Sequence, residues 1–150
     1  MGAVPLLLTF VAMVQDLKTG KIKNWLIFGG MMLAWMQIGY VFIKQSTWKD
    51  KEEALFLLVG SLIIQFIILF SLYCIGALGA GDCKLLLMIG MFFSIKKSIF
   101  ILILSLAIAA LYGSLRNSIQ RIILHREIKP GIHFAGSVFA AHILILLLKL

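Results

Sequence analysis

Six stretches without a charged residue follow one another along the chain, and each is rich in aliphatic and aromatic side chains. They cover residues 1–15, 25–43, 54–81, 85–95, 98–115 and 130–148. About 20 apolar residues in helical form cross the hydrocarbon core of a membrane. Most of these runs have about that length, so each can form one transmembrane helix. The pattern predicts an all-α, polytopic membrane protein with about six transmembrane helices. We expect residues 1–150 to form a single integral membrane domain.

The fourth run, residues 85–95, is the shortest, and apolar runs of about 10–14 residues often do not span a membrane. Extending it over residues 82–97 gives a helix about 24 Å long at 1.5 Å per residue. Lys96 and Lys97 could then reach the far interface with their flexible side chains. The sequence therefore predicts a short fourth span.

Composition supports a lipid environment. The hydrophobic share of this 150-residue chain is 62% and the charged share is 13%, whereas soluble domains average about 45–50% apolar and about 25% charged. A soluble domain of this size has too little interior to hide so much apolar surface. This composition excludes a cytosolic globular enzyme, a disordered tail and a disulfide-stapled secreted module.

The formal net charge of +8 arises from basic residues between the apolar runs. At those positions Lys and Arg meet anionic lipid headgroups, so membrane lipid is the expected partner and nucleic acid is not. The two cysteines, Cys74 and Cys83, have none of the paired spacing of a zinc site. No metal or cofactor is predicted.

The loops also predict an orientation. With six spans, the loops around residues 16–24, 77–84 and 116–129 share one side and hold eight Lys and Arg, against six on the other side. The positive-inside rule then places the first side in the cytoplasm.

Two of the three aspartates stand at the ends of apolar runs on this same side. Asp16 follows the first run and Asp82 precedes the fourth, whereas Asp50 lies in a mixed-charge loop. Ionisable residues that border membrane helices are costly and usually functional. Two carboxyl groups brought close together share a proton, so one can activate a water as general base while the other donates a proton to the substrate. The alternative is two interfacial carboxylates that pair with neighbouring Lys side chains and have no catalytic role.

Backbone chemistry before Asp82 favours a break in the long third run. The segment from Gly76 to Asp82 reads GALGAGD, and its glycines permit unusual dihedral angles and close backbone approach. It can end one helix and open the next at Asp82. A competing catalytic group is not evident, because His125, His133 and His142 have no Ser or Asp partner in a recognisable motif.

These residues carry a resemblance to a known family. Gly79-Ala80-Gly81-Asp82, followed by Lys84-Leu85, resembles the GxGD-x-K-L motif of the type IV prepilin peptidases, and the segment from Asp16 to Asn24 is similar to their first aspartate segment. The resemblance implies an intramembrane aspartic endopeptidase with Asp16 and Asp82 as the catalytic pair. It implies that Gly79 and Gly81 shape the second segment.

The same resemblance implies a partner and a place. The substrates would be prepilins or prepilin-like proteins, cut at the cytoplasmic face of a bacterial or archaeal cytoplasmic membrane. Lys23 stands where the family has a Pro in its Ile-Pro-Asn-like end, and residues 134–137 lack the Pro often found near the last helix. The larger family members also N-methylate the product through a cytoplasmic domain with two Cys pairs. This chain looks like the short, peptidase-only form that serves Tad/Flp-type pili, so methyltransferase activity is not predicted.

Three further residues are candidates for contact with substrate or lipid headgroups: Lys18, Asn24 and Lys84. Two alternative functions stay open on the sequence. One is a non-enzymatic subunit of pilus assembly or an inactive homologue. The other is a small proton-coupled carrier, although such carriers usually show inverted repeats and broken helices in matching halves.

Overall fold

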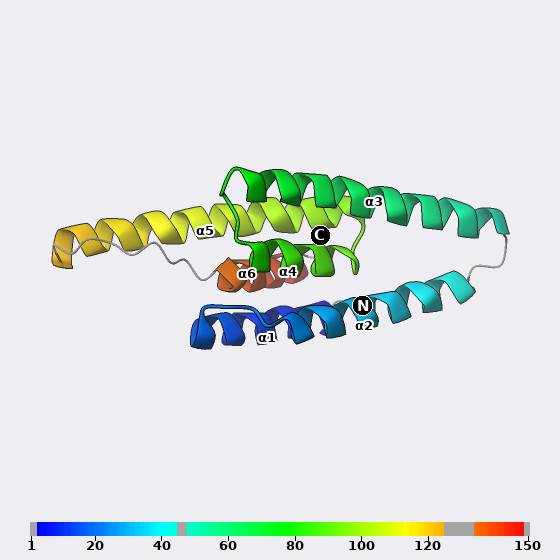
Figure 1. Ribbon diagram of the computed structural model, residues 1–150, viewed down its shortest axis with the longest axis horizontal. Coiled ribbons are helices and arrows are strands. Elements are labelled where there is room, and N and C mark those ends of the chain that lie inside the picture. The colour runs from blue at the N-terminus through cyan, green and yellow to red at the C-terminus, as the bar shows by residue number, and fades with distance from the viewer. Residues whose placement is uncertain (1–2, 45–47, 125–133, 149–150) are drawn as a thin grey trace.

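The computed structural model describes residues 3–44, 48–124 and 134–148, and within them the chain forms six α-helices and no strand. The helices lie roughly along one long axis (Figure 1). Their bounds are α1 Ala3–Thr19, α2 Asn24–Lys44, α3 Trp48–Cys74, α4 Ala80–Gly90, α5 Ile95–Leu124 and α6 Phe134–Leu147. The predicted all-α class is confirmed.

Three of the described helical segments are long and apolar enough to cross a membrane: Asn24–Lys44, Lys51–Cys74 and Ile95–Leu115. Their outward surfaces are covered with large apolar side chains, which only a lipid environment solvates without cost. The protein is therefore a polytopic membrane protein.

The prediction for the fourth run needs correction. The helix there is α4, which has 11 residues and ends at Gly90, before a turn that leads into α5. At 1.5 Å per residue it is about 16 Å long, so it is too short to cross a bilayer by itself. It begins earlier than the predicted run because the glycine-rich segment before it supplies its first turn.

The third helix, α3, ends at Cys74, just before the glycine-rich segment in which a break of the third run is predicted. The boundary predicted for the fifth helix shifts. The fifth was expected to end at residue 115 with a loop over 116–129, but α5 continues to Leu124. Charge marks where a helix leaves the hydrocarbon, and a helix can continue in water beyond that point. The remainder of that predicted loop, 125–129, lies outside the described residues.

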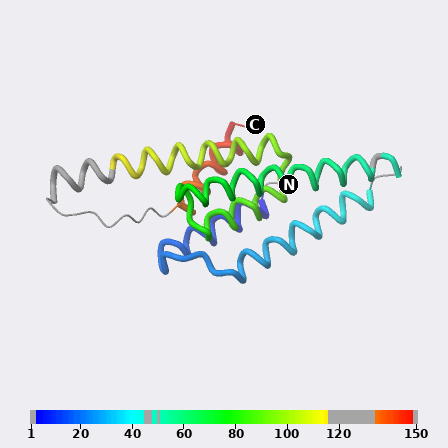
Figure 2. Tube along the Cα trace, turned by 45° about the horizontal axis from the view of Figure 1, so that its top comes forward, coloured from blue at the N-terminus to red at the C-terminus, as the bar shows by residue number. Residues whose placement is uncertain are grey.

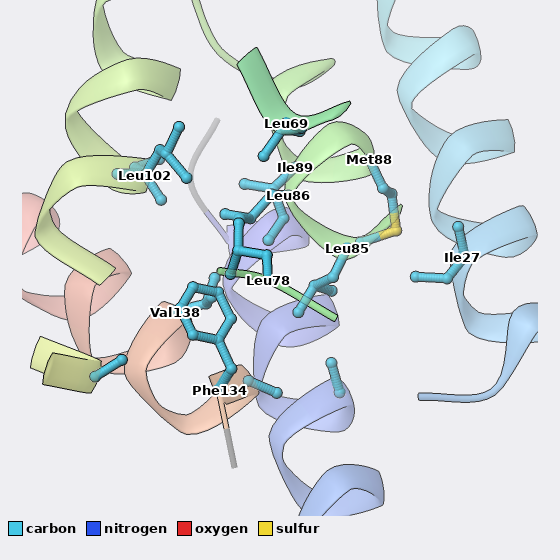
Figure 3. Close-up of a cluster of buried hydrophobic side chains, with 14 of the residues drawn as sticks. Ile27, Leu69, Leu78, Leu85, Leu86, Met88, Ile89, Leu102, Phe134 and Val138 are labelled. Carbon is cyan, nitrogen blue, oxygen red and sulfur yellow. The ribbon is translucent and has the colours of Figure 1, made fainter. Parts of the chain in front are cut away.

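The helix α4 is the centre of the molecule. It contacts each of the other five helices, and Figure 2 shows it enclosed between α1, α3 and the neighbouring segments. Figure 3 shows its side chains beside labelled residues of α2, α3, α5 and α6. The labelled members of this cluster are Ile27, Leu69, Leu78, Leu85, Leu86, Met88, Ile89, Leu102, Phe134 and Val138.

Candidate active site

Asp16 lies in the last turn of α1 and Asp82 in the first turn of α4. The loops next to these two turns contain glycines and lie toward the same end of the bundle (Figure 1). The first loop follows α1, where Gly20 adopts a left-handed φ of 64°. Its N–H donates a hydrogen bond to the Asp16 carbonyl oxygen at 2.8 Å, which is the αL type of helix C-cap. Asp16 therefore sits in the last turn of α1, immediately before the chain reverses.

The second loop follows α3 and ends that helix by a Schellman motif. Gly76 has a φ of 73°, a conformation that side chains with a Cβ rarely adopt. The N–H of Ala77 donates to the Leu72 carbonyl oxygen at 2.9 Å, and the N–H of Gly76 donates to that of Tyr73 at 3.0 Å. The break predicted within the third run is confirmed, and Gly76 is the glycine that makes it.

Asp82 occupies the first turn of α4, three residues after the N-cap residue Gly79. The backbone N–H of Gly79 donates a hydrogen bond to the Asp82 carboxyl group, which is one half of a capping box. A Cβ added to Gly79 would lie 3.0 Å from Asp82 Oδ2. Gly79 thus leaves the space in which the Asp82 side chain folds back over the start of its own helix.

Gly81, the other glycine of the motif, has a looser environment. A Cβ there would meet only the Cβ of Ile22, at 4.0 Å, which is ordinary van der Waals contact. The structure therefore gives a steric reason for glycine at position 79 and none at position 81. A shaping role for Gly81 stays a prediction.

The structure brings the two predicted acids together. Asp16 is buried, with 8% of its surface exposed, and Asp82 is half-buried. The two carboxyl groups are close enough for the charge of Asp16 to act directly on Asp82. Residues 66 positions apart thus form one acidic site between the end of α1 and the start of α4.

Of the three residues predicted to contact substrate or lipid headgroups, two are hydrogen-bonded to each other. Lys84 Nζ donates a hydrogen bond to Asn24 Oδ1 at 3.5 Å, linking α4 to the first residue of α2. Both side chains are exposed, as is Lys18 on α1. The α1–α2 loop is fixed separately, because the Lys23 N–H donates to Gln15 Oε1 at 3.2 Å.

An apolar groove of about 280 Å³ flanks the first turn of α4. Its walls include Phe66, Phe70 and Tyr73 from α3, and Cys83 and Lys84 from α4. These aromatic side chains are exposed on the surface of a membrane helix. The groove therefore lies beside the turn that carries Asp82, on the surface where α3 exposes aromatic side chains.

The histidines and the possible metal ligands do not form a second site in the described part of the chain. His142 is fully buried in α6 and packs edge-on against the Phe93 ring, with 5.3 Å between ring centroids. The other two histidines, His125 and His133, lie outside the described residues. Within the described part of the chain, no group of three or more His, Cys, Asp or Glu side chains could hold a metal ion.

The sequence reasoning missed one residue that the structure places beside α4. Gln65 lies in the middle of α3 and is buried, with 6% of its surface exposed. The signal was available, because a single glutamine stands within a long run of apolar residues. Polar residues inside membrane helices usually face the bundle interior and find partners there.

The fold and the site define a class: an all-helical polytopic membrane protein that holds two acidic side chains together at one end of its bundle. Residues 3–114 match the model of the type IV leader peptidase family. The chain belongs to this family, and the resemblance seen in its sequence is confirmed. Membership assigns the protein a leader peptidase role, with prepilin-type proteins as its substrates. No curated protein and no solved structure matches the chain significantly.

Proposed function

We propose that this protein is an intramembrane aspartic endopeptidase that removes the leader peptide from type IV prepilins or prepilin-like proteins. Asp16 and Asp82 are its catalytic pair. The observation that carries this proposal is that the last turn of α1 and the first turn of α4 bring Asp16 and Asp82 near enough for their charges to interact. Family membership supplies the reaction class, and the paired acids supply groups that can perform it.

The chemistry requires one carboxylate and one carboxylic acid. The carboxylate takes a proton from a water molecule, whose oxygen attacks the carbonyl carbon of the scissile peptide bond while the acid protonates the carbonyl oxygen. When the tetrahedral intermediate collapses, the C–N bond breaks and the leaving amine takes up a proton from the pair. No covalent enzyme intermediate forms, and no metal takes part.

The site belongs at the cytoplasmic face of a bacterial or archaeal cytoplasmic membrane. Residues 16–24 and 77–84, on the side of Asp16 and Asp82, hold four Lys, against three in residues 44–53 on the opposite side, which supports this orientation whether or not α4 crosses the membrane. Lys18, Asn24 and Lys84 lie exposed near that end, where they can contact lipid headgroups or the substrate. Gly79 and Gly81 shape the turn that holds Asp82. We assign the protein to the short form that cleaves without methylating, as in Tad/Flp-type pili.

A cleavage assay tests the proposal. The protein is purified in detergent and incubated with a prepilin-type substrate, and the products are weighed by mass spectrometry. Asp16→Asn and Asp82→Asn should each lower cleavage at least about a thousandfold, because each removes one member of a pair that acts as a unit. The control Asp50→Asn, at the start of α3, should cleave normally.

The same assay separates the alternatives. Full cleavage by either Asp16→Asn or Asp82→Asn would refute the pair. Absence of cleavage by the folded wild-type protein with every prepilin-type substrate would favour a non-enzymatic role in pilus assembly.

A further inference from the structure

Two hydrogen bonds from side chains to backbone carbonyls cross between α3 and α4, and they run in opposite directions. Gln65 Nε2 donates to the Leu86 carbonyl oxygen at 2.9 Å, from α3 to α4. Cys83 Sγ donates to the Leu69 carbonyl oxygen at 3.6 Å, from α4 to α3. The two donors and their acceptors lie within about one turn of each other on each helix. We call these four residues the α3–α4 clamp.

The Gln65 side chain also fills a notch in α4. Gly90 has no side chain, and a Cβ added there would overlap the amide group of Gln65. The amide is therefore held on one side by its hydrogen bond to Leu86 and on the other by the bare backbone of Gly90. A glutamine in this position resists sliding of α4 in either direction along α3.

The hydrogen bond from Gln65 lies in an apolar environment, which makes it important for the position of α4. Gln65 and Leu69, four residues apart on one helix face, are the buried members among the described side chains of α3. The rest of that helix is largely exposed to lipid. An amide without a partner is costly in hydrocarbon, so Gln65 strongly favours the one helix register in which it reaches the Leu86 carbonyl.

We infer that Gln65 is a positioning residue, which fixes α4 along α3 and thereby holds the Asp82 carboxyl group beside Asp16. This inference rests on the proposed function. Leu86 lies one helical turn after Asp82, so a bond that fixes the Leu86 carbonyl also fixes the position and rotation of the turn that carries the acid. Displacements of about 1 Å in a catalytic group can cost about a hundredfold in rate.

Replacing the amide with an apolar side chain of similar size is the first test. Gln65→Leu keeps the packing but removes the donor, so kcat for prepilin cleavage should fall about tenfold or more with little change in KM. Gln37→Leu makes the same chemical change in α2. The Gln37 side chain lines a cavity whose walls come from α2 and the first part of α3, and none of them from α4. This control should cleave at the wild-type rate. Wild-type kcat in Gln65→Leu would overturn the inference.

A conservative variant separates positioning from bulk packing. A protonated glutamic acid can donate the same bond to the Leu86 carbonyl, whereas a carboxylate cannot. In Gln65→Glu the ratio of variant to wild-type kcat should therefore be near one at acidic pH and should fall as the pH rises. A ratio that stays well below one even at acidic pH would contradict the inference, and this variant also decides the matter if Gln65→Leu does not fold.

The notch supplies a third, independent test. Gly90→Ala should displace the Gln65 amide and lower kcat to a similar extent as Gln65→Leu. Because both changes break one contact, the double variant should be no slower than the slower single variant. Multiplicative losses would show two separate effects and would contradict the clamp. Cleavage by Asp82→Asn in parallel reports on the proposed function itself, so its failure is distinguishable from failure of the clamp.

Discussion

The helices α3 and α4 are neighbours in sequence and in space, yet they use apolar residues in opposite ways. The longer one, α3, has 27 residues, and few of its described side chains are buried. The shorter one, α4, has 11 residues, and five of them are buried: Leu85, Leu86, Met88, Ile89 and Gly90. Apolar side chains on α3 mostly face lipid, whereas those on α4 face other helices (Figure 3).

This contrast shows why hydropathy identifies one helix and misjudges the other. A membrane-spanning segment is recognised by length and apolarity, and α3 satisfies both criteria. The helix α4 is equally apolar over its buried residues but is stabilised by five surrounding helices rather than by lipid. Such a helix need not cross the bilayer, and its first turn can present an acid to a neighbouring helix end.

Matched leucines on the two helices test the contrast with the largest expected effect. Leu85 on α4 is fully buried, while Leu57 on α3 has 70% of its surface exposed. Leu85→Ala should lower the free energy of unfolding by about 2–5 kcal/mol, because it leaves a cavity. Leu57→Ala should change it by less than about 0.5 kcal/mol. Equal losses in detergent unfolding experiments would show that α4 is not the packed centre.

A substitution in the turn before α4 should produce the next largest effect, a loss of prepilin cleavage rate. Gly79→Ala should lower kcat about tenfold, because its Cβ presses against Oδ2 of Asp82 and shifts that carboxyl group. The matched control is Gly29→Ala in α2, where a Cβ meets nothing within 4 Å. We expect that control to cleave normally. If both variants behave alike in the cleavage assay, the packing of Gly79 against Asp82 is not what the reaction requires.

The smallest effect is expected at the exposed link between α4 and α2. The hydrogen bond from Lys84 to Asn24 is 3.5 Å long and solvent-accessible, and exposed polar pairs of this kind contribute less than about 0.5 kcal/mol. A double-mutant cycle with Lys84→Ala and Asn24→Ala measures the coupling energy of unfolding. A coupling above about 1 kcal/mol would show that this link, rather than the buried side of α4, positions the helix.

Much of this architecture could be predicted from the sequence, because charge-free runs mark helices in lipid. The apolar runs correspond to the helices that the structure describes, and the placement of Asp16 and Asp82 at one end followed from the alternation of those runs. The end of α3 was harder to predict, because Gly76, Gly79 and Gly81 could each have broken the helix. Only the three-dimensional hydrogen bonding assigns the left-handed residue to Gly76.

The contacts around α4 could not be predicted from local patterns. Gln65 and Gly90 are far apart in sequence, and neither carries a motif that points to the other. Their contact depends on how α3 and α4 are aligned, which side-chain packing decides. The resemblance to a family located the acids, but it did not identify the residues that hold them in place.

Cross-linking tests most directly whether Asp16 and Asp82 share one site. In a Cys74→Ser, Cys83→Ser background, the substitutions Asp16→Cys and Asp82→Cys place one thiol on each helix, and a short thiol-specific bifunctional reagent should join them in the folded protein. Asp16→Cys combined with Leu57→Cys, at the distal part of α3, should stay unlinked. If both thiols react singly with a maleimide yet the first pair never cross-links, the two acids do not form a catalytic pair.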